Sequence, residues 1–427
     1  MKRSLSLLAI VMSFSLVACN NSNTEQEKGS NEVTEISILM GKPEIASEFE
    51  EMLAYYSEEN DITVTMIPLA GQDGYEKMTT LYASGNPPTI IQANTEFNEF
   101  KENFLDISAI EAVDKAFEGT LDYVSEGDGI YGLPVTVEGS ALIYNPEVID
   151  SVFGEEFNIK EIDTLNELDK ILTQIEAAGY GGVTLSPMDW SLGAHLTNPM
   201  YAAQAKDSEG RLSFIDELKN DEVELINNEV FNGWVDAFDI LLKHNIHKEN
   251  PLATTYEDNA QDLANGDAAI WFQGSWVAPD LEPIKPLDYG FIPVPLNNDE
   301  SSYSNGRITV GISGYWCIDE SASTKEEQKA AIDFLNWFIT TEEGQKYFVE
   351  KLKFVPAYEG FNIDPELSLN KEVAEKLEKN EIFEDMSRYY PAGGFQVMGA
   401  SMQKYIDKVI DRDGLAAEFE DYWQSEA

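Results

Sequence analysis

The sequence has few residues that could support redox or metal chemistry. Only two of its 427 residues are cysteine, Cys19 and Cys317, and only three are histidine, His195, His244 and His247. The spacing of His244 and His247 lacks the nearby acidic ligand that would complete a recognised zinc pattern. No Gly-x-Ser-x-Gly turn, which marks one large class of hydrolases, is present either. We therefore expect no metal site, no cofactor and no enzymatic activity.

Basic residues are also scarce. The chain has 28 Lys and Arg against 78 Asp and Glu, a formal net charge of -50, and the acidic residues are spread along its length. A negative field of this size repels nucleic acid and anionic lipid head groups. Nucleic-acid binding is therefore excluded. We interpret the charge as a solvated acidic surface, suited to a saline or alkaline medium, rather than as a patch that recruits a basic partner.

No hydrophobic run is long enough to cross a membrane. The longest, Leu5–Val17, follows the positive start Met1–Arg3 and is ended by the polar residues Asn20–Asn23. A bilayer core of about 30 Å requires roughly 20 apolar residues. This arrangement is typical of a secretory signal peptide, which we assign to residues 1–18.

The end of that segment, Leu16-Val17-Ala18-Cys19, resembles the bacterial lipobox, in which small residues precede a cysteine that is diacylated and becomes the first mature residue. We expect lipidation at Cys19, with palmitate among the acyl chains, and anchoring at the extracytoplasmic face of the cell membrane. Two acyl chains give stable anchoring where one is marginal. Cys317 would then be the only thiol, which excludes an intrachain disulfide and indicates a buried packing residue.

The pattern of the mature chain indicates an α/β fold. Residues 19–33 are polar and aperiodic, typical of a flexible tether. Strand-like segments at 35–40, 62–67 and 89–92 alternate with a helical pattern over 45–56. That order favours a mainly parallel sheet covered by helices. Further on, Thr324 and Glu327 form a possible capping box before a helix over 330–339, and the length of the chain favours two lobes.

Four separated segments resemble those of one family, the extracellular solute-binding proteins of ABC importers, family 1, which includes maltose-binding protein. The segments are LYASGNPPTI (81–90), YGLPVTVEGSALIYNP (131–146), NGDAAIWFQGSW (265–276), and the helix pair of 331–347 with FVPA at 354–357. Thr89 replaces the usual Asp of the first motif, and Ile270 a common Met of the third. The order and spacing of all four carry the resemblance.

The resemblance implies a two-lobed periplasmic-binding-protein-like fold of type II, with a hinge and a ligand cleft between the lobes. Lobe 1 would comprise residues 34–137 and 305–350, and lobe 2 residues 138–304 and 351–427. The chain would cross between them three times. It would be a monomer that binds a sugar or oligosaccharide, closes around it and delivers it to the permease subunits of an ABC importer.

A sugar site needs aromatic platforms for C–H faces and planar polar groups for hydroxyls. The resemblance assigns sugar stacking to Trp276 and Tyr144, although a buried, backbone-bonded Tyr144 is equally consistent with its apolar strand. It assigns a ligand-facing carboxylate to Glu138. Gln92, Asn94 and Glu96 stand at the carboxyl end of the third strand, where open α/β sheets bind ligands.

Six further candidates come from loops. Trp190 and Asp189 lie in one loop, and packing of Trp190 against a neighbouring helix is an alternative. Lys42 follows the first strand. Phe395 and Gln396 stand where the family sends an aromatic side chain into the cleft, and Gly311 lies in a glycine-rich run, 306–315, that we interpret as a strand near the hinge.

Two other functions remain open from the sequence. An exported glycoside hydrolase requires two carboxylates, but with 78 acidic residues any pair can be found. The same fold could also bind a polyamine, a metal complex or a phosphodiester, and a polyamine would likewise stack on aromatic rings.

Overall fold

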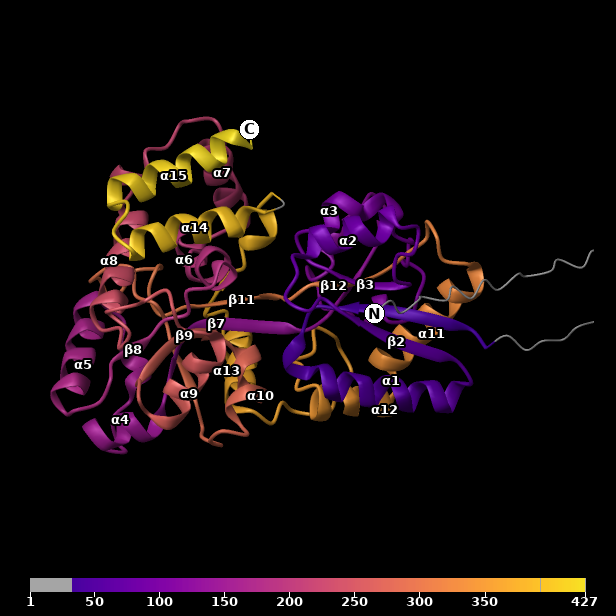
Figure 1. The fold of residues 1–427 in the computed structure, drawn as a ribbon, viewed down its shortest axis with the longest axis horizontal. Coiled ribbons are helices and arrows are strands. Elements are labelled where there is room, and N and C mark those ends of the chain that lie inside the picture. The colour runs from indigo at the N-terminus through magenta and orange to yellow at the C-terminus, as the bar shows by residue number, and fades with distance from the viewer. Residues whose placement is uncertain (1–32, 392, 427) are drawn as a thin grey trace, which may run out of the picture. The chain divides into compact units, whose positions relative to one another are not determined.

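The computed structural model describes residues 33–391 and 393–426 (Figure 1). The expected signal peptide, the expected lipidation site Cys19 and nearly all of the expected tether lie outside these residues. In the part of the chain that is described, no helix has the length and hydrophobicity needed to span a bilayer.

The first of two large sheets contains the strands that the sequence predicts. Its order is β2-β1-β3-β12-β6, and its strands are β1 Glu35–Met40, β2 Thr63–Pro68, β3 Ile90–Ala93, β6 Leu133–Pro134 and β12 Tyr315–Ile318. β1 pairs in parallel with β2 and β3, whereas β12 is antiparallel to both of its neighbours. We call this sheet and the helices packed on it the first lobe.

The helix α1 (Ala46–Asn60) connects β1 to β2, and α2 (Gly74–Ala83) connects β2 to β3. α1 buries Phe49, Met52, Leu53 and Tyr56, the positions at helical spacing that predict it. The first three strands and the first helix therefore confirm the sequence interpretation.

The second sheet has the order β13-β11-β7-β9-β8, with β10 also on β7. Its strands are β7 Val137–Tyr144, β8 Val183–Thr184, β9 Ile270–Gly274, β10 Gly290–Ile292, β11 Ile308–Ile312 and β13 Ile382–Glu384. Three of the pairings of β7, with β9, β10 and β11, are antiparallel. The expectation of a mainly parallel sheet is therefore wrong for this sheet, which with its helices forms the second lobe.

The remaining elements cover these sheets. A small hairpin joins β4 Ser125–Glu126 and β5 Gly129–Ile130. The other helices are α3 Phe97–Phe100, α4 Pro146–Phe153, α5 Leu165–Ala177, α6 Asn198–Ala202, α7 Ser208–Lys219, α8 Glu229–Lys243, α9 Tyr256–Asn265, α10 Ala278–Leu281, α11 Lys325–Thr340, α12 Glu342–Lys346, α13 Ser368–Glu378, α14 Gly394–Ile406 and α15 Arg412–Ser425. α14 and α15 pack on each other in the second lobe (Figure 1).

Within residues 33–391 and 393–426 the chain passes between the sheets three times. The first passage joins β6 to β7 and the second joins β11 to β12. The expected boundary at residue 305 is wrong, because β11 pairs with β7 and β13 of the second sheet. The boundary at 351 is wrong as well, since the amide of Phe117 donates to the carbonyl of Ala357 and that of Glu359 to Lys115, both in the first lobe. The third passage therefore precedes α13, and the other expected boundaries stay predictions.

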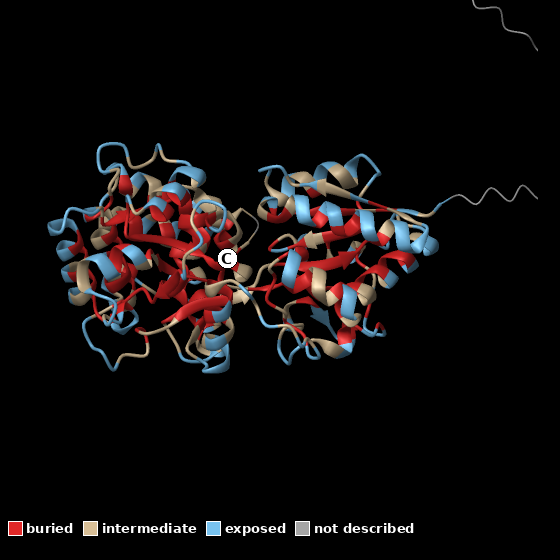
Figure 2. Cartoon of the chain, turned by 90° about the horizontal axis from the view of Figure 1, so that it is seen from below, coloured by how far each residue is buried: buried red, intermediate tan, exposed pale blue. Residues whose placement is uncertain are grey.

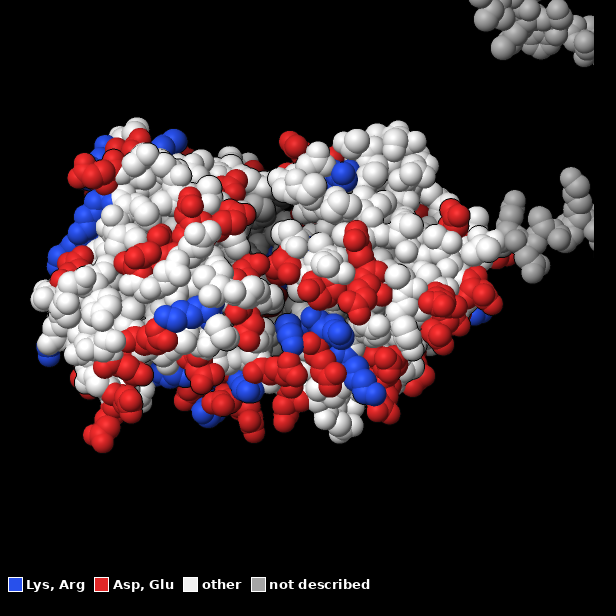
Figure 3. Space-filling view, turned by 60° about the horizontal axis from the view of Figure 1, so that its bottom comes forward, with Lys and Arg blue, Asp and Glu red and all other residues white. Residues whose placement is uncertain are grey.

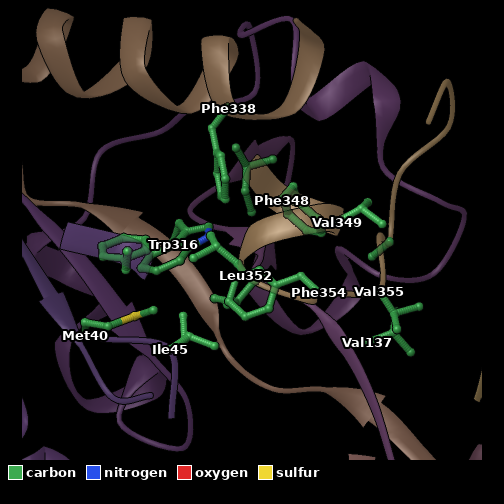
Figure 4. Close-up of a cluster of buried hydrophobic side chains, with 14 of the residues drawn as sticks. Met40, Ile45, Val137, Trp316, Phe338, Phe348, Val349, Leu352, Phe354 and Val355 are labelled. Atoms are coloured by element: carbon green, nitrogen blue, oxygen red, sulfur yellow. The ribbon is translucent and has the colours of Figure 1, made fainter. Parts of the chain in front are cut away.

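Apolar side chains fill the space between each sheet and its helices. Figure 2 shows the strands of both sheets largely buried and the exposed residues on the outer sides of the helices. In the first lobe, Trp316 of β12 and Phe338 of α11 are buried in one cluster with Phe354 (Figure 4). Cys317 is fully buried beside Trp316, and burial raises the pKa of its thiol. The expectation that Cys317 is a packing residue is confirmed.

The helix α11 begins with the capping box that the sequence predicts. The Thr324 hydroxyl accepts from the amide of Glu327, and the Glu327 carboxylate accepts from the amide of Thr324. Two of the otherwise unpaired amides at the start of the helix are thereby satisfied.

Replacement of the cap tests this local interaction. We expect Thr324→Ala to lower the free energy of unfolding by about 1 kcal/mol, the usual cost of losing a side-chain cap. Thr324→Ser keeps the hydroxyl and is the matched control. Urea unfolding followed by circular dichroism measures both, and equal losses in the two variants would show that the hydroxyl is not what stabilises the start of α11.

Candidate functional site

The carboxyl ends of β1 and β3 place polar side chains at one edge of the first sheet. Gln92, in β3, accepts a hydrogen bond at Oε1 from the amide of Gly41, 2.9 Å away, and donates from Nε2 to the carbonyl of Ser313 at 3.3 Å. Ser313 lies on the second passage between the lobes. Gln92 therefore connects the turn after β1 to a crossing segment, which satisfies both ends of its amide.

Glu96 follows the same strand and is closely surrounded. Its Oε2 accepts from the amide of Asn94 at 2.9 Å, and a Cβ added at Gly74 would stand 2.2 Å from its Oε1. Burial raises the pKa of Glu96, and backbone hydrogen bonds lower it by less. Glu96 is thus fixed in place at the start of α2.

Lys42 forms a buried ion pair with Glu138 of the second sheet. Lys42 Nζ lies 2.6 Å from Glu138 Oε1 and 3.5 Å from Glu44 Oε1, and the side chains of Lys42 and Glu138 are 7% and 15% exposed. Burial lowers the pKa of Lys42, but Glu138 and Glu44 together raise it above its ordinary value. Burial also raises the pKa of Glu138, and Lys42 opposes that shift. The pair joins the turn after β1 to the start of β7.

Four aromatic rings of the second lobe gather beside this pair, and we call them the aromatic cluster: Trp190, His195, Tyr256 and Trp276. The ring centroids of His195 and Trp276 are 4.7 Å apart, those of Trp190 and Trp276 are 6.2 Å apart, and those of Trp190 and Tyr256 are 6.1 Å apart. All four side chains are half-buried. Aromatic faces held in this way are suited to stacking against C–H surfaces.

His195 reaches the cluster from a π-helical segment, Ser191–Leu196, a distortion that recurs at functional sites. Burial lowers the pKa of His195, Asp385 raises it and Lys42 lowers it further. The imidazole is therefore neutral at pH 7, with one nitrogen that donates and one that accepts.

The segment between β13 and α14 adds two further charged residues, Asp385 and Arg388. The guanidinium of Arg388 donates from Nε to the carbonyl of Asp385 at 3.0 Å. Both side chains lie against the β11 backbone, since a Cβ at Gly311 would stand 2.5 Å from Asp385 Cβ and 3.3 Å from Arg388 Nη2. Because Gly311 has no side chain, Asp385 and Arg388 can approach the β11 backbone closely.

One hydrogen bond connects the N-terminal ends of α2 and α14. Gln396 Nε2 donates to Asp73 Oδ2 at 2.8 Å, and the other oxygen of Asp73 accepts from the amide of Glu76 at the start of α2. Asp73 belongs to the first lobe and Gln396 to the second. The two lobes thus touch here as well as at Lys42 and Glu138.

A narrow crevice lies between the ion pair and the aromatic cluster. It is lined by Glu44 and Phe354 on one side, and by Glu138, Ser275 and Trp276 on the other. Figure 3 shows that Asp and Glu side chains are more widespread than Lys and Arg on one face of the molecule. The site itself is also rich in carboxylates, and the buried Lys42 is paired with two of them, while the half-buried Arg388 lies near Asp385.

The structure brings together most of the residues that the sequence singles out. Lys42 and Glu138 are in contact, Trp190 and Trp276 share the aromatic cluster, and Gln396 bridges to the first lobe. Gln92, Asn94 and Glu96 stand at the facing edge of the first sheet.

Tyr144 is not at this site. It ends β7 six residues after Glu138, about 20 Å along the strand at the usual rise per residue. Its ring lies against Gly290, and burial, followed by the nearby Glu372 carboxylate, raises the pKa of the phenol to about 12. Tyr144 is therefore a half-buried residue of the second lobe that lies away from the aromatic cluster.

Asp189 and Phe395 pack where the π-helical segment meets α14. Asp189 Oδ1 accepts from the amide of Trp190 at 2.7 Å. The backbones of Asp189 and Phe395 approach Gly399 and Gly193 so closely that a Cβ on either glycine would be 2.5 Å or less from a backbone atom. These contacts fix the π-helical segment against α14.

Sequence reasoning missed His195, Tyr256, Asp385 and Arg388. Arg388 offered a signal, because the chain has only five arginines and one of them, Arg3, lies in the expected signal peptide. The other three lie in segments without a distinctive pattern, and only the tertiary fold brings them together.

Removal of Lys42 tests the buried ion pair. We expect Lys42→Met to lower the free energy of unfolding by about 3–5 kcal/mol at pH 7, because Glu138 is left as an unpaired buried charge. The variant also loses the group that lowers the pKa of Glu138. In the variant, the pKa of Glu138 in the folded state lies further above its ordinary value. A carboxyl group of this kind stabilises the folded state at pH values below its ordinary pKa, and this stabilisation is lost as the pH rises through the raised pKa. The loss should therefore be smaller at pH 5 than at pH 7.

Urea unfolding at the two pH values measures this difference. Lys101→Met, which removes a solvent-exposed pair with Glu126, is the matched control and should change stability by less than about 1 kcal/mol. An equal loss in the two variants, or a loss independent of pH, would contradict the assigned role of the pair.

Comparisons with known proteins place the fold. Residues 45–375 match the family of bacterial extracellular solute-binding proteins. A maltooligosaccharide ABC transporter solute-binding lipoprotein of Streptococcus pneumoniae serotype 4 is 23% identical over 82% of this chain and 78% of its own.

Two solved structures have the same fold at low identity. RafE of Streptococcus pneumoniae in complex with raffinose is 19% identical, with a TM-score of 0.75 over 92% of this chain and 99% of that one. A sugar transporter from Bacillus licheniformis in complex with stachyose is 15% identical, with a TM-score of 0.71 over 92% and 100%. These likenesses confirm the predicted two-lobed type II fold. The chain belongs to the family of bacterial extracellular solute-binding proteins.

Proposed function

We propose that this chain binds an oligosaccharide between its two lobes and delivers it to an ABC importer. The observation that carries the proposal is the aromatic cluster, which stands beside the ion pair of Lys42 and Glu138. One lobe supplies ring faces, and together the two lobes supply charged and planar hydrogen-bonding groups.

This combination matches the surface of a sugar. The ring of Trp276 can stack on the apolar C–H face of a pyranose, while carboxylate, ammonium and amide groups bond its rim of hydroxyls. The indole N–H groups of Trp190 and Trp276 have no protein acceptor among the described residues. The sugar complexes and the maltooligosaccharide name found among similar proteins support this reading.

Closure of the lobes would complete the site. The two passages at β6–β7 and β11–β12 are short and lie side by side, since the strands that they join pair within each sheet. Segments of this kind act as hinges in binding proteins. A ligand that contacts both Trp276 and the edge of the first sheet would bind the closed form more tightly than the open form. It would therefore shift the equilibrium towards the closed form.

The proposal includes attachment to the membrane. Lipidation at Cys19 would retain the receptor at the extracytoplasmic surface, next to permease subunits in the same membrane, and the chain would act as a monomer. The lipoprotein names of the curated relatives support this part.

Isothermal titration against a panel of ligands tests the proposed function. We expect saturable binding of at least one of maltose, maltotriose, raffinose and stachyose, without release of reducing ends. Spermidine and glycerophosphodiesters are the comparison ligands. Binding of only a cation or a phosphodiester would refute a sugar receptor, and release of reducing ends would indicate a hydrolase instead.

Trp276 is the residue whose loss should matter most. We expect Trp276→Ala to weaken sugar binding ten-fold or more, which corresponds to about 1.4 kcal/mol, the size of a lost stacking contact. Trp337→Ala, which removes a half-buried Trp of α11 in the first lobe, is the matched control. Titration of both variants below their unfolding temperatures makes the comparison, and equal affinities would place Trp276 outside the site.

A further inference from the structure

An open groove of about 500 Å³ lies in the second lobe, outside the crevice described above. Its volume falls within the range of small-molecule sites. One wall is the loop from Pro187 to Trp190, and the other is the segment from Leu252 to Glu257. Gln403 of α14 joins the first wall, since its Nε2 donates to the carbonyl of Pro187 at 2.8 Å.

The groove is continuous with the aromatic cluster. Trp190 and Tyr256 line the groove and also belong to the cluster, where Trp190 meets Trp276 edge-on. Burial, followed by the Asp280 carboxylate, raises the pKa of the Tyr256 phenol, and the charges of Glu44 and Glu138 raise it further. The Tyr256 hydroxyl donates to Asp280 Oδ2 at 3.0 Å, and the residue borders the groove. Trp190 and Tyr256 thus border both the groove and the aromatic cluster.

The lining suits the same kind of ligand as the cluster. Trp190, Met188 and Leu252 offer apolar surface, while the hydroxyls of Thr254 and Thr255 and the amide of Gln403 offer hydrogen-bonding groups. Apolar faces with a few convergent polar groups are the pattern required by a sugar ring.

The groove is also rigid. Thr255 and Asp258 form a capping box that fixes the start of α9, and the Thr254 hydroxyl donates to the carbonyl of Leu185 at 3.3 Å. A wall held by such bonds loses little conformational entropy when a ligand binds.

All residues of the groove belong to the second lobe. A sugar unit that occupies it therefore needs no contact with the first lobe and leaves the closure of the lobes unaffected. The groove can accordingly accept additional units of a chain whose first units lie between the lobes.

We propose that this groove binds the third and later units of an oligosaccharide, and that the protein is a receptor for chains of three or more units rather than for disaccharides. This inference rests on the proposed function, because the first units must lie against Trp276. The groove then sets the preferred length of the ligand.

Titration with two length series tests the proposal: maltose to maltotetraose, and sucrose, raffinose and stachyose. In the series that binds, we expect the affinity to rise at least ten-fold from the disaccharide to the tetrasaccharide. Equal affinities for all lengths would overturn the groove proposal and leave the sugar receptor intact. Failure of every sugar to bind would overturn the proposed function itself.

A matched pair of variants locates the effect. Glu257 is exposed on the first turn of α9 and lines the groove, whereas Glu249 is exposed but does not line it. We expect Glu257→Trp to obstruct the groove and weaken tetrasaccharide binding about ten-fold, while disaccharide binding stays unchanged. Glu249→Trp should change neither.

Thermal unfolding shows whether both variants remain folded, and neither residue makes a buried contact whose loss would prevent folding. A gain in affinity confined to the tetrasaccharide would also support occupancy, since the new indole could stack on the added unit. An equal change for all lengths, or no change, would overturn the assignment of the groove.

Discussion

The two lobes contact each other through a buried cation, Lys42. Lys42 cannot be buried alone at acceptable cost, and Glu138 and Glu44 supply the charges that allow it. Because Lys42 follows β1 and Glu138 begins β7, this requirement fixes the edge of one sheet against the start of the other. His195 and Tyr256 lie close enough for the same charges to shift their pKa values. The ion pair thus sets both the geometry and the electrostatics of the site.

The two lobes make different contributions. The first provides rigid polar groups, such as Gln92, whose amide is fixed to the turn after β1 and to a crossing segment. The second provides aromatic rings, held in place by the close packing of the π-helical segment on α14. Neither set alone offers both ring faces and a full set of hydrogen-bonding partners. This division gives a physical reason for a ligand to favour the closed arrangement.

Individual strands, helices and helix caps could be predicted from the sequence. The positions of side chains relative to the site could be predicted only in part. The strand Glu35–Met40, the helix after it and the capping box at Thr324 follow from periodicity and capping chemistry, which act over a few residues. The resemblance assigns Tyr144 to the site, but Tyr144 stands at the opposite end of β7 from Glu138, and a sequence does not show at which end of a strand the ligand lies.

The run 306–315 shows the same limit. The sequence pattern predicts one strand there, yet the chain ends β11 at Ile312 and begins β12 in the other sheet at Tyr315. Gly314 allows this change of sheet with a φ of +124°, a conformation that other residues rarely adopt. His195, Tyr256 and Asp385 left no comparable sign, since their proximity arises only when distant segments pack together.

A crystal structure of the chain with a bound oligosaccharide tests the central claim most directly. We expect a sugar ring stacked on Trp276, with a hydroxyl within hydrogen-bond distance of a side chain at the edge of the first sheet, such as Lys42 or Gln92. A sugar bound at full occupancy that contacts only one lobe, or that lies away from Trp276, would contradict the account.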